Sequence, residues 1–171
     1  MRKEVSEKTV VLIFLLFIMV GVLFSYGIYK EYYKVNKISI QALNNDKKIL
    51  YYIDSIKESP QNGITDVRGW AFKQNQNLKT FKTYVALKNL KTDEVFKINT
   101  VIVGRKDVTL HFNLNIAADD KKNTYNYDNS GFLGRFDKSK LKSKGQYEIC
   151  ILYLSDKNTE FVPTGKLLEI N

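Results

Sequence analysis

The sequence has almost none of the residue types on which metal sites, disulfides and general-base catalysis most often depend. It contains a single cysteine, Cys150, and a single histidine, His111. One cysteine excludes an intramolecular disulfide, and one residue of each type excludes a zinc site built from cysteine and histidine. Cys150 lies in an apolar segment, which predicts a buried, unreactive thiol. We therefore expect a protein without a metal or a cofactor, and one that is not an enzyme.

Long apolar runs are also scarce, and the one exception is the charge-free run Val10–Ile28. About 20 apolar residues suffice to cross a bilayer, so we predict a transmembrane signal anchor over residues 10–29 that contacts the lipid bilayer. The alternative is a cleaved signal peptide that ends near Ser25 or Gly27, although the apolar part of such peptides usually has only ~7–15 residues. Lipoprotein processing is not expected, because it requires a cysteine at the end of the run and the chain has only Cys150.

The count of basic residues does not decide the orientation of this segment, because three lie on each side of it. They are Arg2, Lys3 and Lys8 before the run and Lys30, Lys34 and Lys37 after it. A single apolar segment ahead of a complete domain is typical of exported proteins. We therefore predict a single-pass cell-membrane protein with residues 1–9 in the cytoplasm. Residues 30–47 would form a juxtamembrane linker and first strand, and residues 48–171 an extracytoplasmic domain.

Acidic residues are in the minority. The chain has 27 Lys and Arg against 18 Asp and Glu, and removing the five charged residues before the run leaves 24 against 16, a formal charge of +8. Such a charge favours salt-sensitive attraction to anionic lipids or glycopolymers, although solubility alone would also explain it. The lysines are scattered rather than gathered in a stripe, so we predict no nucleic-acid partner.

The rest of the sequence lacks repeats and lacks any segment with helical periodicity. The clearest pattern is Val108–Ile116, where apolar and polar residues alternate and predict a half-buried strand with His111 exposed on its polar face. Gln146–Ser155 is apolar on both faces, which predicts a central strand covered on two sides. The weaker strand candidates are Lys37–Ala42, Ile49–Lys57, Ile64–Phe72, Thr80–Leu90, Val95–Val103, Phe132–Asp137 and Lys166–Ile170.

Turn residues separate these segments, including a predicted hairpin loop over residues 91–94. Seven to nine short strands at this spacing predict an all-β fold, namely an antiparallel immunoglobulin-like β-sandwich preceded by one N-terminal transmembrane helix. The longest polar loop is predicted over residues 117–129. Loops at the end of a sandwich are where binding sites are usually found.

Aromatic and guanidinium side chains are the candidates for ligand recognition, since aromatic faces stack on sugar rings and guanidinium groups bind phosphate or carboxylate. Trp70 follows a glycine inside a predicted strand, which favours a core residue packed between two sheets. Tyr125 and Tyr127 lie in the polar loop, where no core requires them. Asp119, Asp120 and Asp128 could supply oxygen ligands to calcium, but their spacing matches no EF-hand, and a solvated loop is favoured.

Several short motifs are arranged in a familiar order. They are Gly69-Trp70-Ala71, Arg105-Lys106-Asp107-Val108, the run from Tyr127 to Phe132, and Leu141 ahead of Gly145-Gln146-Tyr147. In this order they resemble a β-sandwich accessory module of Gram-positive membrane-anchored surface proteins that are associated with cell-wall polysaccharide or teichoic-acid enzymes. The resemblance implies an envelope setting and a non-catalytic accessory role.

Arg105 and Asp107 open a predicted strand and are close enough to pair with each other or with the turn after Tyr127. One interpretation is a structural salt bridge that holds the turn. The other is a polar pocket at one end of the sandwich, with binding residues Arg105, Asp107, Tyr125, Tyr127 and Asp128.

The sequence favours an extracytoplasmic, non-catalytic domain that binds or assists cell-envelope polysaccharide, with an anionic cell-wall glycopolymer as one candidate partner. Two alternatives stay open: a structural partner subunit of a membrane protein complex, and an envelope enzyme whose catalytic groups meet only in the folded chain.

Overall fold

The computed structural model describes residues 6–39, 49–59, 61, 63–78, 81–116, 124–141, 143–155 and 159–170. The chain divides into two compact units, Met1–Tyr33 and Lys34–Asn171. The first strand of the second unit lies directly after the boundary.

The first unit contains one long helix, α1 (Glu7–Tyr32). Ser6 caps its start, because the Ser6 side chain accepts a hydrogen bond from the Thr9 backbone N–H at 3.3 Å. The helix covers all of the predicted span over residues 10–29, and none of its residues is buried. It is long enough and apolar enough to cross a membrane, a property that an N-terminal signal sequence shares.

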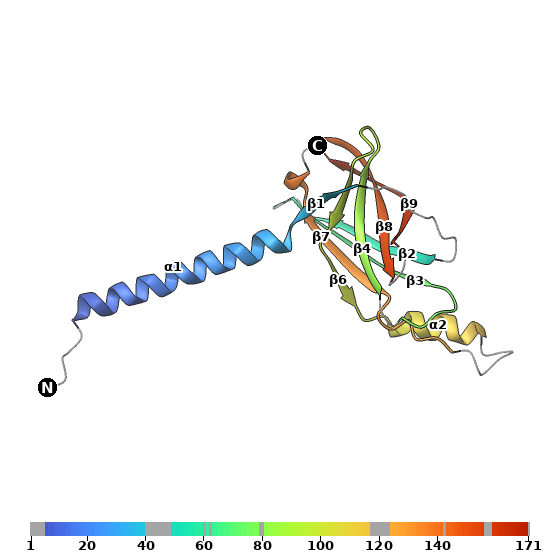
Figure 1. Ribbon diagram of the computed structural model, residues 1–171, viewed down its shortest axis with the longest axis horizontal. Helices are drawn as coiled ribbons and strands as arrows, with labels where there is room; N and C mark the ends of the chain where they lie inside the picture. Colours follow the sequence, from blue (N-terminus) through green and yellow to red (C-terminus); the bar gives the residue numbers. More distant parts are fainter. Residues whose placement is uncertain are drawn as a thin grey trace. The chain divides into compact units, whose positions relative to one another are not determined.

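The second unit contains two antiparallel β-sheets (Figure 1). The five-stranded sheet has the order β1 (Val35–Ile38), β5 (Val95–Ile98), β4 (Phe81–Asn89), β8 (Gly145–Ser155) and β9 (Thr159–Ile170). The four-stranded sheet has the order β2 (Ile49–Glu58), β3 (Ile64–Lys73), β7 (Gly131–Asp137) and β6 (Thr100–Val103). A short 3-10 helix, Lys138–Lys140, follows β7.

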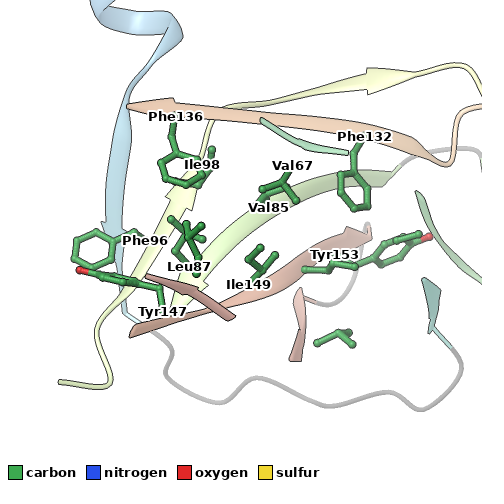
Figure 2. Close-up of a cluster of buried hydrophobic side chains, with 14 of the residues drawn as sticks. Val67, Val85, Leu87, Phe96, Ile98, Phe132, Phe136, Tyr147, Ile149 and Tyr153 are labelled. Atoms are coloured by element: carbon green, nitrogen blue, oxygen red, sulfur yellow. The ribbon is translucent and has the colours of Figure 1, made fainter. Parts of the chain in front are cut away.

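The main hydrophobic core draws side chains from both sheets (Figure 2). Val67 and Phe132 come from the four-stranded sheet, and Val85 and Ile149 come from the five-stranded sheet. Gly134 allows a close approach between the sheets, since a Cβ there would lie 2.5 Å from a methyl carbon of Val85. Alternate residues of each strand therefore point into a shared interior.

Most of the strand predictions are confirmed. Gln146–Ser155 is a strand, β8, which lies between β4 and β9 and is buried on both faces. The hairpin between β4 and β5 forms as predicted, with Asn89 Oδ1 accepting hydrogen bonds from the backbone N–H groups of Lys91 and Thr92 at 2.9 Å and 3.0 Å. The predicted strand Lys37–Ala42 is confirmed only as far as β1, because residues 40–48 lie outside the described part.

The predicted single strand Val95–Val103 is wrong in one respect, because it is two strands in different sheets. Asn99 separates β5 from β6, and the chain passes there from the five-stranded to the four-stranded sheet. Each half pairs with a different partner, β5 with β1 and β4, and β6 with β7.

The strongest strand prediction, Val108–Ile116, is wrong. This segment is a helix, α2 (Lys106–Ile116), drawn in yellow in Figure 1. Val108 and Phe112 are four residues apart, so a helix brings both to one face, where they cover the outer side of the four-stranded sheet. Leu110 and Leu114 lie on another face and are 63% and 72% exposed. Packing on the sheet has thus overridden the alternating pattern.

Candidate binding site

The candidate site begins with aromatic side chains on the outer face of the four-stranded sheet. Along β3, Val67 and Ala71 point into the main core, whereas Trp70 and Phe72 point to the opposite face. Trp70 is therefore not the residue between two sheets that the sequence predicted. It is half-buried, and its ring lies 5.5 Å from that of Phe72.

Helix α2 covers this face and completes an aromatic cluster. The Phe112 ring lies 4.8 Å from Phe72 and 5.5 Å from Trp70, edge-on to both. Phe72 also stacks on Tyr127, with ring centroids 3.9 Å apart. Edge-on and offset contacts of this kind are the favoured aromatic geometries. The rings therefore form a second packed layer outside the sheet.

Two polar residues of α2 fasten the helix to the following loop. The Thr109 hydroxyl oxygen accepts a hydrogen bond from the Tyr127 backbone N–H at 2.9 Å. The Asn113 amide donates to the Tyr125 carbonyl at 2.9 Å and accepts from the Tyr125 N–H at 3.2 Å. These bonds satisfy the backbone of the loop where it passes the helix.

A pocket of about 300 Å³ lies where α2 meets the sheet. Its lining residues come from β3, from the segment before α2 and from the first turns of α2: Trp70, Arg105, Asp107, Val108, His111 and Phe112. Trp70 and Phe112 supply apolar wall, while Arg105, Asp107 and His111 supply polar groups. The pocket thus joins aromatic surface to hydrogen-bonding groups, the usual composition of a small-ligand site.

Arg105 is the centre of the polar side and is bound by two carboxylates. Its Nε lies 2.9 Å from Asp107 Oδ1, and its Nη2 lies 2.8 Å from Asp107 Oδ2. Its Nη1 donates to Asp54 Oδ2 at 2.5 Å. The hydrogen bond with Asp107 raises the pKa of Arg105 and lowers the pKa of Asp107.

Two backbone features allow this arrangement. The pairing of β2 with β3 shifts register between Ile53 and Ser55, so Asp54 has no partner on β3, as in a β-bulge. The Asp54 side chain reaches Arg105 from this position. Gly131 leaves room for the Arg105 stem, because a Cβ on Gly131 would lie 2.5 Å from Arg105 Cγ. Both features place the guanidinium against the sheet.

The structure brings together only part of the predicted binding set. Arg105 and Asp107 pair and both line the pocket. Tyr127 is buried in the aromatic cluster, and Tyr125 is half-buried against it. The prediction that these two residues lie in a polar loop where no core requires them is therefore wrong. Asp128 takes part through its backbone carbonyl, which accepts a hydrogen bond from the Arg105 N–H at 2.6 Å.

Three residues around this pocket were not among the predicted binding residues: Asp54, His111 and Phe112. For the two residues of α2, the signal was the spacing of four residues between Asp107 and His111 and between Val108 and Phe112, which places each pair on one helix face. Asp54 carried no sequence signal, because its position depends on the irregular pairing of β2.

The structure also bears on the calcium candidates and on Cys150. Among the described residues no group of three histidine, cysteine, aspartate or glutamate side chains is placed to hold a metal ion. Asp119 and Asp120, the predicted calcium candidates besides Asp128, lie outside the described part. Cys150 is buried, as predicted, and burial raises the pKa of its thiol to about 12.

Comparison of the chain with protein-family models, with curated proteins and with solved structures finds no match.

Proposed function

We propose that this chain is a membrane-anchored, non-catalytic domain on the outer side of the cell membrane, and that it binds polysaccharide of the cell envelope. The observation that carries the proposal is the pocket in which Trp70 and Phe112 lie beside the Arg105–Asp107 pair. Aromatic surface next to paired polar groups suits the two kinds of surface of a sugar, its C–H faces and its hydroxyl groups.

The apolar helix α1 supports the location. It has 26 residues, and its only charged residues lie in its first and last turns, at Glu7, Lys8, Lys30 and Glu31. At 1.5 Å per residue its charge-free middle reaches across a bilayer core of roughly 30 Å. Anchoring by α1, with Lys34–Asn171 outside the cytoplasm, is part of the proposal.

An immunoglobulin-like arrangement is the second part. The order β2-β3-β7-β6 matches strands A, B, E and D of that fold, and β5-β4-β8-β9 matches C′, C, F and G. Tyr147, near the start of β8, donates a hydrogen bond from its hydroxyl to the Ser143 carbonyl at 2.7 Å. This contact has the form of the tyrosine corner found at the start of strand F in immunoglobulin-like domains.

Sedimentation with isolated Gram-positive cell walls tests the proposed function. The full chain in detergent micelles is mixed with intact walls and with walls stripped of their covalently attached polymers, at low and at high salt. We expect binding to intact walls to persist at high salt and to disappear with stripping. Binding that salt abolishes would be nonspecific attraction to the +8 charge, and would contradict the proposal.

A protein partner is the second candidate, and the exposed apolar side chains of α2 favour it. Leu110 and Leu114 point away from the aromatic cluster, and Ile102 of β6 is also exposed. Co-purification of one membrane protein with the full chain in detergent, lost on Leu110→Ser with Leu114→Ser, would support this candidate. No wall binding together with such co-purification would replace the polysaccharide proposal.

A further inference from the structure

We infer that the pocket beside Trp70 takes an uncharged, hydroxyl-bearing sugar ring, and that anionic parts of the polymer are held elsewhere, by the scattered lysines. This inference rests on the proposed function and specifies its ligand class. It assigns two kinds of contact to two different parts of the domain.

The charge balance of the pocket argues against an anionic ligand. All three guanidinium nitrogens of Arg105 already donate to carboxylate oxygens, to Asp107 through Nε and Nη2 and to Asp54 through Nη1. One cation and two carboxylates carry a formal charge of −1. A phosphate or carboxylate ligand would have to displace a carboxylate partner of Arg105 and would meet the repulsion of both.

The polar groups that stay available suit hydroxyls. The Asp107 carboxylate accepts from Arg105 and from the backbone N–H groups of Asp107 and Val108, but its side chain is 67% exposed, so a ligand hydroxyl can reach its oxygens. His111 is exposed on the same helix face and lines the pocket. Its ring nitrogens can donate and accept. Together these residues offer acceptors and donors to neighbouring hydroxyls of one ring.

The apolar side of the pocket suits the C–H face of a sugar ring. The rings of Trp70 and Phe112 lie 5.5 Å apart at an interplanar angle of 73°, so they form two walls of a corner. The volume of about 300 Å³ is at the lower limit for small-molecule sites. The pocket is therefore suited to one sugar ring, and the neighbouring units of a polymer would lie outside it.

Binding should then have two separable components. Attraction of the basic domain to an anionic polymer falls with ionic strength, whereas stacking and hydrogen bonding of a neutral ring do not. Trp70 is the only tryptophan in the chain, so intrinsic tryptophan fluorescence reports on this pocket alone.

The first test is a fluorescence titration of the full chain in detergent micelles. The probes are neutral oligosaccharides of hexoses and N-acetylhexosamines, with poly(glycerol phosphate) as the anionic probe. We expect at least one neutral oligosaccharide to give a saturable change in Trp70 emission, with a Kd that changes less than about twofold between low and high salt. Poly(glycerol phosphate) should leave the emission unchanged at high salt.

The second test alters the charge of the pocket with little change in its shape. Asp107→Asn removes a carboxylate and leaves Arg105 with a single carboxylate partner. We expect it to weaken binding of the neutral oligosaccharide about tenfold and to strengthen binding of poly(glycerol phosphate). Asp93→Asn is the matched control, because Asp93 lies in the β4–β5 hairpin, is 79% exposed and pairs only with Lys88 among the described contacts. It should change neither affinity.

The outcomes separate this inference from the proposed function. A saturable Trp70 response to poly(glycerol phosphate) at high salt would overturn the neutral-ring assignment and leave polysaccharide binding in place. A response to neither probe would also overturn it. In that case, the proposed function would still be supported if the unaltered chain sediments with walls at high salt and Trp70→Ala does not. Sedimentation that Trp70→Ala leaves unchanged would remove the pocket from the proposal.

Discussion

Gly131 determines how closely Arg105 approaches the four-stranded sheet. A Cβ at this position would lie 2.4 Å from the Val103 carbonyl oxygen and 2.5 Å from Arg105 Cγ. Since the carbonyl belongs to a paired strand, we expect Gly131→Ala to lower the free energy of unfolding by about 1–3 kcal/mol, measured by denaturant unfolding. Gly104→Ala is the control, because apart from its two chain neighbours no residue has an atom within 4 Å of a Cβ there. Equal losses in the two variants would contradict this account.

Asp66 and Arg135 form an ion pair across β3 and β7 that makes stability depend on pH. The Arg135 side chain donates to Asp66 from Nε at 2.5 Å and from Nη2 at 2.6 Å, and this bond lowers the pKa of Asp66 from 3.8. A carboxyl group with a lowered folded-state pKa stabilises the fold above its unfolded pKa. That contribution disappears as the pH falls through the folded pKa.

We therefore expect Asp66→Asn to reduce the free energy of unfolding at pH 7 by about 1 kcal/mol, the upper end for partly exposed ion pairs. The difference from the unaltered chain should hold to about pH 5 and shrink below about pH 3.8, as denaturant unfolding at each pH would show. Asp93→Asn should change stability by less than about 0.5 kcal/mol throughout. A difference that grows as the pH falls would have the wrong sign for a lowered pKa.

At the scale of elements, α2 provides the sharpest contrast between what the sequence predicts and what forms. In a strand, Leu110 and Phe112 would point the same way and would be equally buried. In α2, Phe112 packs on Trp70 and Phe72, whereas Leu110 is exposed. We expect Phe112→Ala to lower the free energy of unfolding by roughly 2–3 kcal/mol and Leu110→Ala by less than about 0.5 kcal/mol. Similar losses for both, measured by thermal or denaturant unfolding, would favour the strand.

The strands were predictable because their apolar patterns and turn residues agree with their packing. Gln146–Ser155 became β8, and the hairpin after Asn89 formed with its expected polar turn. The helix was not predictable in this way, because Val108–Ile116 satisfies a period of two as well as a spacing of four. The aromatic face beneath it, which decides between the two, is assembled from β3 and from the loop that contains Tyr127.

The candidate site, too, could be predicted from the sequence only in part. Arg105 and Asp107 were identifiable from sequence, since they lie two residues apart and carry opposite charges. Trp70 was identifiable as a residue type but not as a pocket wall, because its face of the sheet depends on the register of β3. Asp54, from β2, joins the site only through an irregular pairing. Residues that come together from distant segments thus required the fold.

At the scale of the whole molecule, the proposed function needs an apolar helix, a basic domain and the small pocket beside Trp70. The +8 charge would concentrate the domain near anionic polymer, and the pocket would supply the contact that salt does not remove. Neither feature alone distinguishes specific binding from adsorption. The pocket makes the distinction testable, because a single substitution at Trp70 should affect one component and leave the other.

Wall sedimentation of Trp70→Ala at high salt is the most direct test of the central claim. The unaltered chain and Tyr84→Ala should stay bound, since Tyr84 is a half-buried aromatic on the other sheet with Lys97 over its ring. Trp70→Ala should lose at least about tenfold in affinity while retaining a melting transition and salt-sensitive binding at low ionic strength. Binding of Trp70→Ala equal to that of Tyr84→Ala at high salt would contradict the claim that this pocket recognises polysaccharide.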